Sequence, residues 1–91
     1  MRDMTEDSLW LFNILYNCRY KLTSKDKLVA TYLTLTPLEE NAHKVSGNFV
    51  LAISASSGLA VRTVQKSLGR LVAIGAVTFL TDYHFILEDV K

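Results

Sequence analysis

The residues from Ile53 to Val77 constrain the fold of this chain most strongly, because two glycines divide them into segments of helical length. Gly58 can adopt the left-handed conformation that lets a chain leave a helix abruptly, and Gly75 can end a second helix. Between these glycines, four apolar residues recur at the spacing of one helix face: Val61, Val64, Leu68 and Leu71. The stretch therefore predicts two helices joined by a short turn, of which the second is amphipathic.

The opposite face of this second helix carries polar and basic side chains: Arg62, Thr63, Gln65, Lys66 and Arg70. Such groups hydrogen-bond the base edges and the phosphate oxygens of nucleic acid. The same pattern is also typical of a helix face that is only solvated. Charge alone does not separate these two interpretations.

Five short pieces of this stretch follow a known pattern: Gly58-Leu59, Thr63-Val64, Leu68, Leu71 and Gly75-Ala76-Val77. Together they resemble the winged helix-turn-helix of many bacterial and phage DNA-binding proteins, most closely the compact forms in replication initiators and small regulators of phages and plasmids. The chain departs from that pattern at Ser54 and Ser57, where apolar residues are usual, and at Ala60, where Ser or Thr caps the second helix. The missing cap costs about 1 kcal/mol, so packing or another group must hold the start of that helix.

The resemblance implies one domain over residues 1–91, in the α+β class and mainly α. It would comprise an extra N-terminal helix at 6–20, a helix-turn-helix at 48–74 and a two-stranded β-hairpin wing at 76–88. In such proteins the second helix of the motif enters the major groove. Arg62 and Gln65 are the expected base readers, because Arg pairs bidentately with guanine and Gln with adenine. The other expected DNA contacts, to phosphate or to thymine methyl groups, are Thr63, Lys66, Arg70, Ser56 and Ser57.

The N-terminal segment predicts a helix that Thr5 can cap and that is apolar over much of its circumference. One stripe holds Leu9, Phe12 and Tyr16, and an adjacent stripe holds Trp10, Ile14 and Cys18. Such breadth fits either a core helix or a helix that also meets a second chain. The candidate dimer contacts are Leu9, Trp10 and Phe12.

The intervening residues predict a further helix and short connections. Thr23 and Asp26 have the spacing of a capping box before a helix at 25–35, and Pro37 ends that helix. We expect one short turn at 37–40, a brief strand at 44–46 and a helix at 49–57 with Asn48 as its cap. The wing is expected as strands at 77–80 and 83–87 around a tight turn at Thr81-Asp82.

The net charge is only +1, but the charges are distributed unevenly. No Asp or Glu lies between Asn41 and Thr81, where Lys44, Arg62, Lys66 and Arg70 fall. A second basic group at Arg19, Lys21, Lys25 and Lys27 is offset only by Asp26. Local asymmetry of this kind matters more for DNA binding than the total charge. The wing has no Lys or Arg between Val77 and Leu87, so it should add little to DNA affinity.

Other functions have little support in the sequence. His43 and His84 have no Ser, Cys or carboxylate at a recognisable catalytic spacing, and no phosphate-binding glycine loop occurs. The single cysteine, Cys18, allows no disulfide within the chain and no zinc cluster. We therefore expect no catalytic residues, no metal, no cofactor and no small-molecule ligand. With no membrane span and no signal peptide, we expect a cytoplasmic protein.

The expected function is sequence-specific binding of double-stranded DNA, as a homodimer, in transcription regulation or replication initiation of a plasmid, phage or similar element. The alternative is a protein-interaction module of the same fold, which assembles a larger complex through its apolar N-terminal helix.

Overall fold

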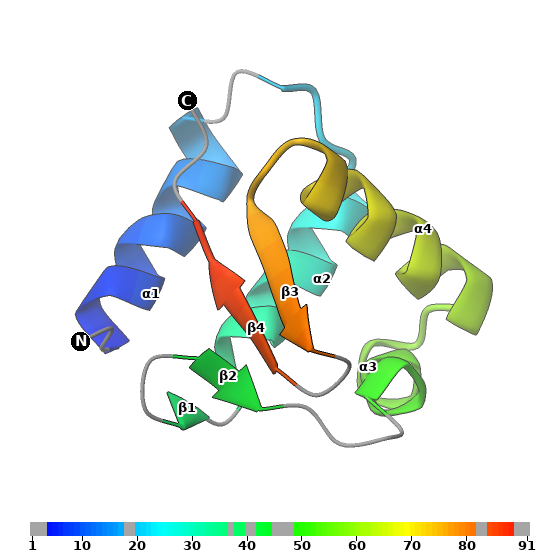
Figure 1. Ribbon diagram of the computed structural model, residues 1–91. Helices are drawn as coiled ribbons and strands as arrows, with labels where there is room; N and C mark the ends of the chain where they lie inside the picture. The colour runs from blue at the N-terminus through cyan, green and yellow to red at the C-terminus, as the bar shows by residue number, and fades with distance from the viewer. Residues whose placement is uncertain are drawn as a thin grey trace.

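The computed structural model describes residues 4–17, 20–36, 38–39, 42–44, 49–81 and 84–88. It is an α+β fold that is mainly helical (Figure 1). In chain order its elements are α1 (Met4–Phe12), a π-helical turn η1 (Asn13–Asn17), α2 (Ser24–Thr34), β1 (Leu38–Glu39), β2 (Ala42–Lys44), α3 (Phe49–Ser57), α4 (Val61–Ala73), β3 (Val77–Thr81) and β4 (His84–Leu87). None of the helices in these residues is long and apolar enough to cross a membrane.

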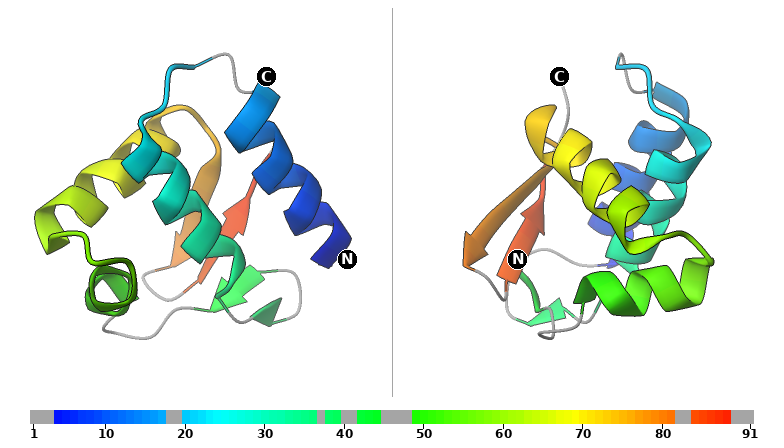
Figure 2. Two further views of the ribbon diagram at one scale, coloured as in Figure 1. Left: turned by 180° about the vertical axis from the view of Figure 1, so that it is seen from behind. Right: turned by 90° about the vertical axis from the view of Figure 1, so that its right-hand side faces the viewer.

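The strands form an antiparallel sheet in the order β1-β2-β4-β3, and the helices α1, α2 and α4 lie to one side of the β3–β4 hairpin (Figure 2). Along β4, Phe85 and Leu87 are buried while His84 and Ile86 are half-buried. This alternation follows from the two-residue period of a strand, which turns every second side chain toward the helices. The sheet therefore closes one side of a single core.

The core joins the apolar faces of α1, α2 and α4 to that side of the sheet, with Ile14, Val29, Leu33, Val64 and Leu71 among its buried members. These positions recur at three- and four-residue intervals along their helices, as a helix with one buried stripe requires. The amphipathic spacing expected for the second helix of the motif is thus confirmed in α4, where Val64, Leu68 and Leu71 are buried.

Trp10 belongs to this core, which corrects its expected role as a dimer contact. Its side chain is 1% exposed, and its indole N–H donates to the carbonyl oxygens of Ala76, at 3.1 Å, and Glu88, at 3.0 Å. These two carbonyls flank the hairpin, immediately before β3 and after β4. Trp10 therefore fastens the N-terminal helix to the sheet and is not available to a second chain.

Some of the observed helices and strands have the boundaries expected from the sequence, and others do not. The helix at 49–57, the capping box of Thr23 and Asp26 and the presence of two strands after Gly75 are confirmed, but Thr81, expected in the turn, is the last residue of β3. The N-terminal helix was expected at 6–20 but begins at Met4, and its helical turns end at Asn17. The expected turn at 37–40 is wrong, because residues 38–39 form β1, and the brief strand lies at 42–44 instead of beginning at Lys44. Cys18, Asn48, Asp82 and the expected strand residues 45–46 lie outside the described residues.

The turn between α3 and α4 shows how the chain compensates for its unusual residues. Gly58 has a φ of 78°, as its expected left-handed conformation requires, and Ala60 makes no side-chain cap. The hydroxyl groups of Ser54 and Ser57 bind the turn instead: Ser54 Oγ donates to the Leu59 carbonyl, and Ser57 Oγ accepts from the Leu59 amide at 3.2 Å. The two serines therefore hold the segment that leads into α4.

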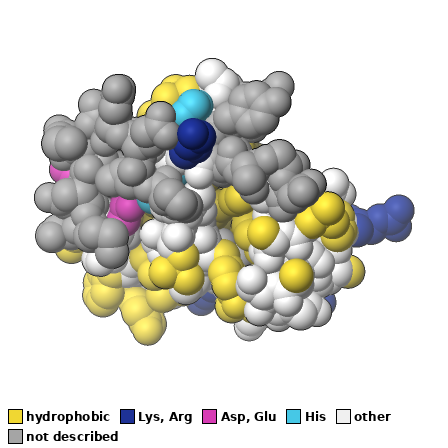
Figure 3. Space-filling view, turned by 90° about the horizontal axis from the view of Figure 1, so that it is seen from below, with side chains coloured by type: hydrophobic (Ala, Val, Ile, Leu, Met, Phe, Trp, Pro, Cys, Tyr) yellow, Lys and Arg dark blue, Asp and Glu magenta, His cyan; other side chains and the backbone are white. Residues whose placement is uncertain are grey.

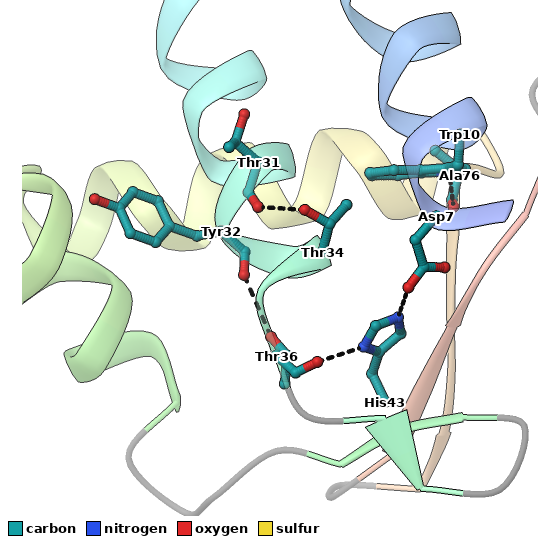
Figure 4. A network of polar contacts seen from close by, with 8 residues as sticks. All are labelled: Asp7, Trp10, Thr31, Tyr32, Thr34, Thr36, His43 and Ala76. Atoms are coloured by element: carbon teal, nitrogen blue, oxygen red, sulfur yellow. Dashed lines mark hydrogen bonds and ion pairs between the residues drawn. The ribbon is translucent and has the colours of Figure 1, made fainter. Parts of the chain in front are cut away.

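A buried polar pair that the sequence did not predict links α1 to β2 (Figure 4). His43 Nδ1 lies 2.8 Å from the Thr36 carbonyl oxygen, to which it must donate, and Nε2 lies 2.9 Å from Asp7 Oδ2. The latter is a close contact between polar atoms and not a well-aligned hydrogen bond. The His43 ring also stacks on Phe85, with ring centroids 5.0 Å apart. Because His43 and Asp7 are both buried, this pair contributes to packing and does not face solvent.

Candidate nucleic-acid interface

The solvent-facing side of α4 carries most of the residues expected to contact DNA. Arg62, Gln65, Lys66 and Arg70 are exposed, and Thr63 is half-buried. At 100° per residue, Arg62 lies opposite the buried stripe, Gln65 lies toward one flank, and Lys66 and Arg70 lie toward the other. The helix therefore presents a polar ridge that contains cations and no carboxylate.

Gly69 lies on the same ridge, two helical turns after Arg62. A Cβ atom placed there would have no atom of the described residues within 4 Å. Internal packing therefore gives no reason for a glycine, although glycine in a helix costs about 1 kcal/mol relative to alanine. The position leaves the α4 backbone open to close approach from outside the molecule.

The serines at the end of α3 differ in their surroundings. Ser57 is half-buried, and its Oγ donates to the Ile53 carbonyl at 2.6 Å, so its one proton is engaged within the chain and its expected contact with a phosphate stays a prediction. Ser56 is exposed and remains compatible with such a contact, while its carbonyl accepts from Tyr32 Oη at 2.9 Å. In the view onto the end of the molecule where α3 lies, Lys and Arg are sparse among the coloured side chains (Figure 3). The sequence of α3 itself contains no charged residue.

Arg70 is held by a buried carboxylate, a contact that the sequence did not predict. Arg70 Nη1 donates to Asp26 Oδ1 at 2.7 Å, while the arginine side chain remains 51% exposed. Asp26 also accepts from Ser67 Oγ at 2.7 Å and from the Thr23 amide at 3.1 Å. Burial alone would raise the pKa of Asp26, but the hydrogen bonds from Ser67, Thr23 and Arg70 together outweigh it and lower that pKa. Asp26 is therefore ionised at neutral pH and fixes Arg70 beside α2.

The β3–β4 hairpin offers little for a nucleic acid. It contains no Lys or Arg in β3 or β4, and its large exposed side chains are apolar, with Phe79 40% and Leu80 56% exposed. His84 is half-buried, and its Nδ1 lies 3.2 Å from Thr81 Oγ1. The two strands therefore supply no positive charge for a phosphate.

A separate apolar stripe runs along α1 and η1. Leu9 is 61% exposed, Phe12 52% and Tyr16 72%, and the rings of Phe12 and Tyr16 lie 5.2 Å apart. The two stripes expected from the sequence are therefore both present, but the one that contains Trp10 and Ile14 is buried and the other is exposed. Of the candidate dimer contacts, Leu9 and Phe12 remain accessible.

Within the described residues, no group of three or more His, Cys, Asp or Glu side chains could hold a metal ion. Comparisons of the chain with protein-family models, with curated proteins and with solved structures find no match. The function is therefore inferred from the geometry of α4 and its neighbours.

Proposed function

We propose that this chain is a winged helix-turn-helix protein that binds double-stranded DNA sequence-specifically, with α4 in the major groove. The observation that carries the proposal is the acid-free ridge of α4, on which Arg62, Gln65 and Lys66 are all exposed. The arrangement around it is the one such a protein needs: α3 and α4 meet at a three-residue turn that contains Gly58, and an antiparallel hairpin follows.

Each residue on the ridge has a chemically suited role. Arg62 can bond the O6 and N7 atoms of guanine and Gln65 the N6 and N7 atoms of adenine, so these two read bases. Lys66, with Thr63 beside it, contacts the phosphate backbone, which positions the protein but does not specify sequence. The cellular role that agrees with the sequence resemblance is transcription regulation or replication initiation of a plasmid, phage or similar element, in the cytoplasm.

The direct test is selection of bound sites from random duplex DNA, followed by affinity measurements on variants. Arg62→Ala should cost about 1–3 kcal/mol of binding free energy and relax the preference at one base pair. Combined with Lys66→Ala, it should also weaken binding to all sequences and lower the slope of log affinity against log salt concentration by about 1 for the lysine.

The matched control is Lys21→Ala with Lys27→Ala, which removes the same charge from residues that are not part of α4. This pair should change duplex affinity far less than the α4 pair. Equal losses in the two double variants, or no loss from the α4 pair, would show that α4 does not enter the groove.

We also infer that the exposed stripe of α1 and η1 packs against a second copy of the chain. Leu9, Phe12 and Tyr16 repeat at i, i+3 and i+7, the spacing at which two helices can pack along their length. A dimer would also suit a protein that reads paired half-sites about one helical turn apart. The rival function, a protein-interaction module that assembles a larger complex, uses the same stripe for a different protein.

Sedimentation velocity separates these possibilities. The wild-type protein should sediment as a dimer, and Phe12→Glu should sediment as a monomer because the added charge faces the partner. Leu51→Glu is the control, since Leu51 is comparably exposed, at 54%, but lies on α3. A wild-type monomer at high protein concentration would exclude the dimer, and duplex binding by neither form would favour the interaction module.

A further inference from the structure

An open cleft of about 510 Å³ lies between the first turn of α2 and the flank of α4. Three basic residues line it: Lys25 from α2, and Lys66 and Arg70 from α4. Hydroxyl side chains from both helices complete the lining, Ser24 and Thr63 among them. The cleft therefore combines cations and hydrogen-bond donors from segments that are about 40 residues apart in the sequence.

The charge of the cleft favours an anion. The carboxylate of Asp26 contacts three residues of the lining; it is buried and already accepts from Thr23, Ser67 and Arg70. Arg70 uses Nη1 for this bond, so its other guanidinium N–H groups remain for a ligand. Among the described residues, neither Lys25 nor Lys66 has an ion-pair partner. The cleft thus has three positively charged side chains and one adjacent carboxylate, and the oxygens of that carboxylate already accept hydrogen bonds.

Backbone amides at the start of α2 also favour an anion in the cleft. The first amides of a helix have no partner within the helix. In α2 the amide of Asp26 is bound by Thr23 Oγ1 at 3.2 Å, and that of Lys27 by the Thr23 carbonyl at 3.1 Å. No acceptor among the described residues binds the amides of Ser24 and Lys25. A phosphate oxygen in the cleft could therefore accept from these amides as well as from the cations.

The position of the cleft would place it beside the DNA backbone when α4 lies in the major groove. The major groove is about 12 Å wide, and a helix with its side chains is about 10–12 Å across. A helix that fills the groove therefore has a phosphate backbone along each flank. Lys66 and Arg70 lie on the flank of α4 that faces α2, and the cleft opens there. The first turn of α2 would meet the backbone that borders this flank.

We propose that the cleft between α2 and α4 binds a phosphate group of the DNA backbone, with Lys25 and the Ser24 and Lys25 amides as contacts additional to those of α4. This inference rests on the proposed function, since the phosphate belongs to a duplex whose major groove holds α4. It assigns a DNA contact to α2, and it makes Asp26 a positioning residue that holds Arg70 at the cleft.

The test compares Lys25→Ala with Lys27→Ala, because residues two apart on a helix point in different directions and only Lys25 lines the cleft. Lys25→Ala should weaken binding of selected and unrelated duplexes by the same factor and lower the salt slope by about 1. Lys27→Ala should leave that slope near the wild-type value. Sequence preference should change with neither variant, unlike with Arg62→Ala.

A second measurement examines the cleft without DNA. In a titration of the full chain with inorganic phosphate, the NMR amide signals of Ser24 and Lys25 should shift together and saturate, and Lys25→Ala should abolish the shift. Tight duplex binding by the wild type with no effect of Lys25→Ala would overturn this inference and leave the proposed function intact. Failure of the wild type to bind any duplex would overturn the proposed function. A phosphate response in that case would assign the cleft to a phosphate from another source and would equally overturn the DNA contact.

Discussion

Replacement of Trp10 by alanine is expected to lower the free energy of unfolding by about 4 kcal/mol, the range of large aromatic truncations in protein cores. The indole is 1% exposed, and its N–H satisfies two carbonyl oxygens, of Ala76 and Glu88. Its removal would leave a cavity between α1 and the hairpin and two carbonyls without this donor. A domain of this size is stable by only about 5–14 kcal/mol. Chemical denaturation followed by far-UV circular dichroism measures the change.

The matched control is Leu9→Ala, one residue earlier on the same helix. Leu9 is 61% exposed, so its truncation should cost well under 1 kcal/mol in the monomer. The loss of unfolding free energy in Trp10→Phe should lie between those of Trp10→Ala and Leu9→Ala, because phenylalanine keeps the aromatic packing but loses the N–H donor. If Trp10→Ala cost no more than Leu9→Ala, the N-terminal helix would not be docked on the sheet as the structure has it.

This contrast between neighbouring residues shows what local sequence does not predict, namely which of two apolar stripes is buried. Helical spacing divides α1 and η1 into a stripe with Trp10 and Ile14 and a stripe with Leu9 and Phe12, but both stripes are apolar. Packing against α2 and the hairpin decides which stripe is buried, and the two carbonyls that accept from Trp10 lie more than sixty residues away, at the ends of the hairpin. A local pattern contains no information about that contact, so the dimer contacts could not be sorted correctly in advance.

Features that depend on neighbouring residues were predictable. Thr23 and Asp26 bind each other's backbone amides across three residues, and the sequence spacing specifies that box. Gly58 and Gly75 have φ values of 78° and 82°, conformations that L side chains rarely adopt. The α3–α4 pair and the hairpin after Gly75 follow from the same local chemistry.

Contacts between distant segments were not predictable in this way. The strand at 38–39 exists because it pairs with residues 42–43, and the latter strand in turn pairs with β4. The pairing of Asp7 with His43, and that of Asp26 with Arg70, joins segments whose approach depends on the whole fold. The candidate site was therefore predictable along α4, whereas its continuation onto α2 was not.

Asp26→Ala is expected to lower the free energy of unfolding by about 3 kcal/mol, near the lower end for breaking a buried charge pair. The substitution removes the cap of α2 and leaves the buried Ser67 hydroxyl without its acceptor. Arg70 moderates the cost, because its half-exposed guanidinium can turn to water. Glu88→Ala is the control: Glu88 is an exposed carboxylate that accepts from Thr78 Oγ1, and its loss should cost under about 1 kcal/mol. Denaturant unfolding at neutral pH gives both values, and equal costs would mean that Asp26 is not the buried link between α2 and α4.

The charge of Asp26 also predicts how its contribution to the stability of the fold depends on pH. Hydrogen bonds in the folded state outweigh burial and hold the pKa of Asp26 below its ordinary value of 3.8, so the unfolded chain takes up the proton first as pH falls. The stabilisation is therefore complete above the unfolded-state pKa and is lost as pH falls through the lower folded-state pKa. Asp26→Asn, which is close in shape but cannot ionise, provides the comparison. The stability difference between wild type and Asp26→Asn should be constant from neutral pH to about pH 5 and should shrink below pH 3.8. A difference that stayed constant through the acidic range, or grew as pH fell, would show that the carboxylate is not stabilised in its ionised form by Arg70, Ser67 and Thr23.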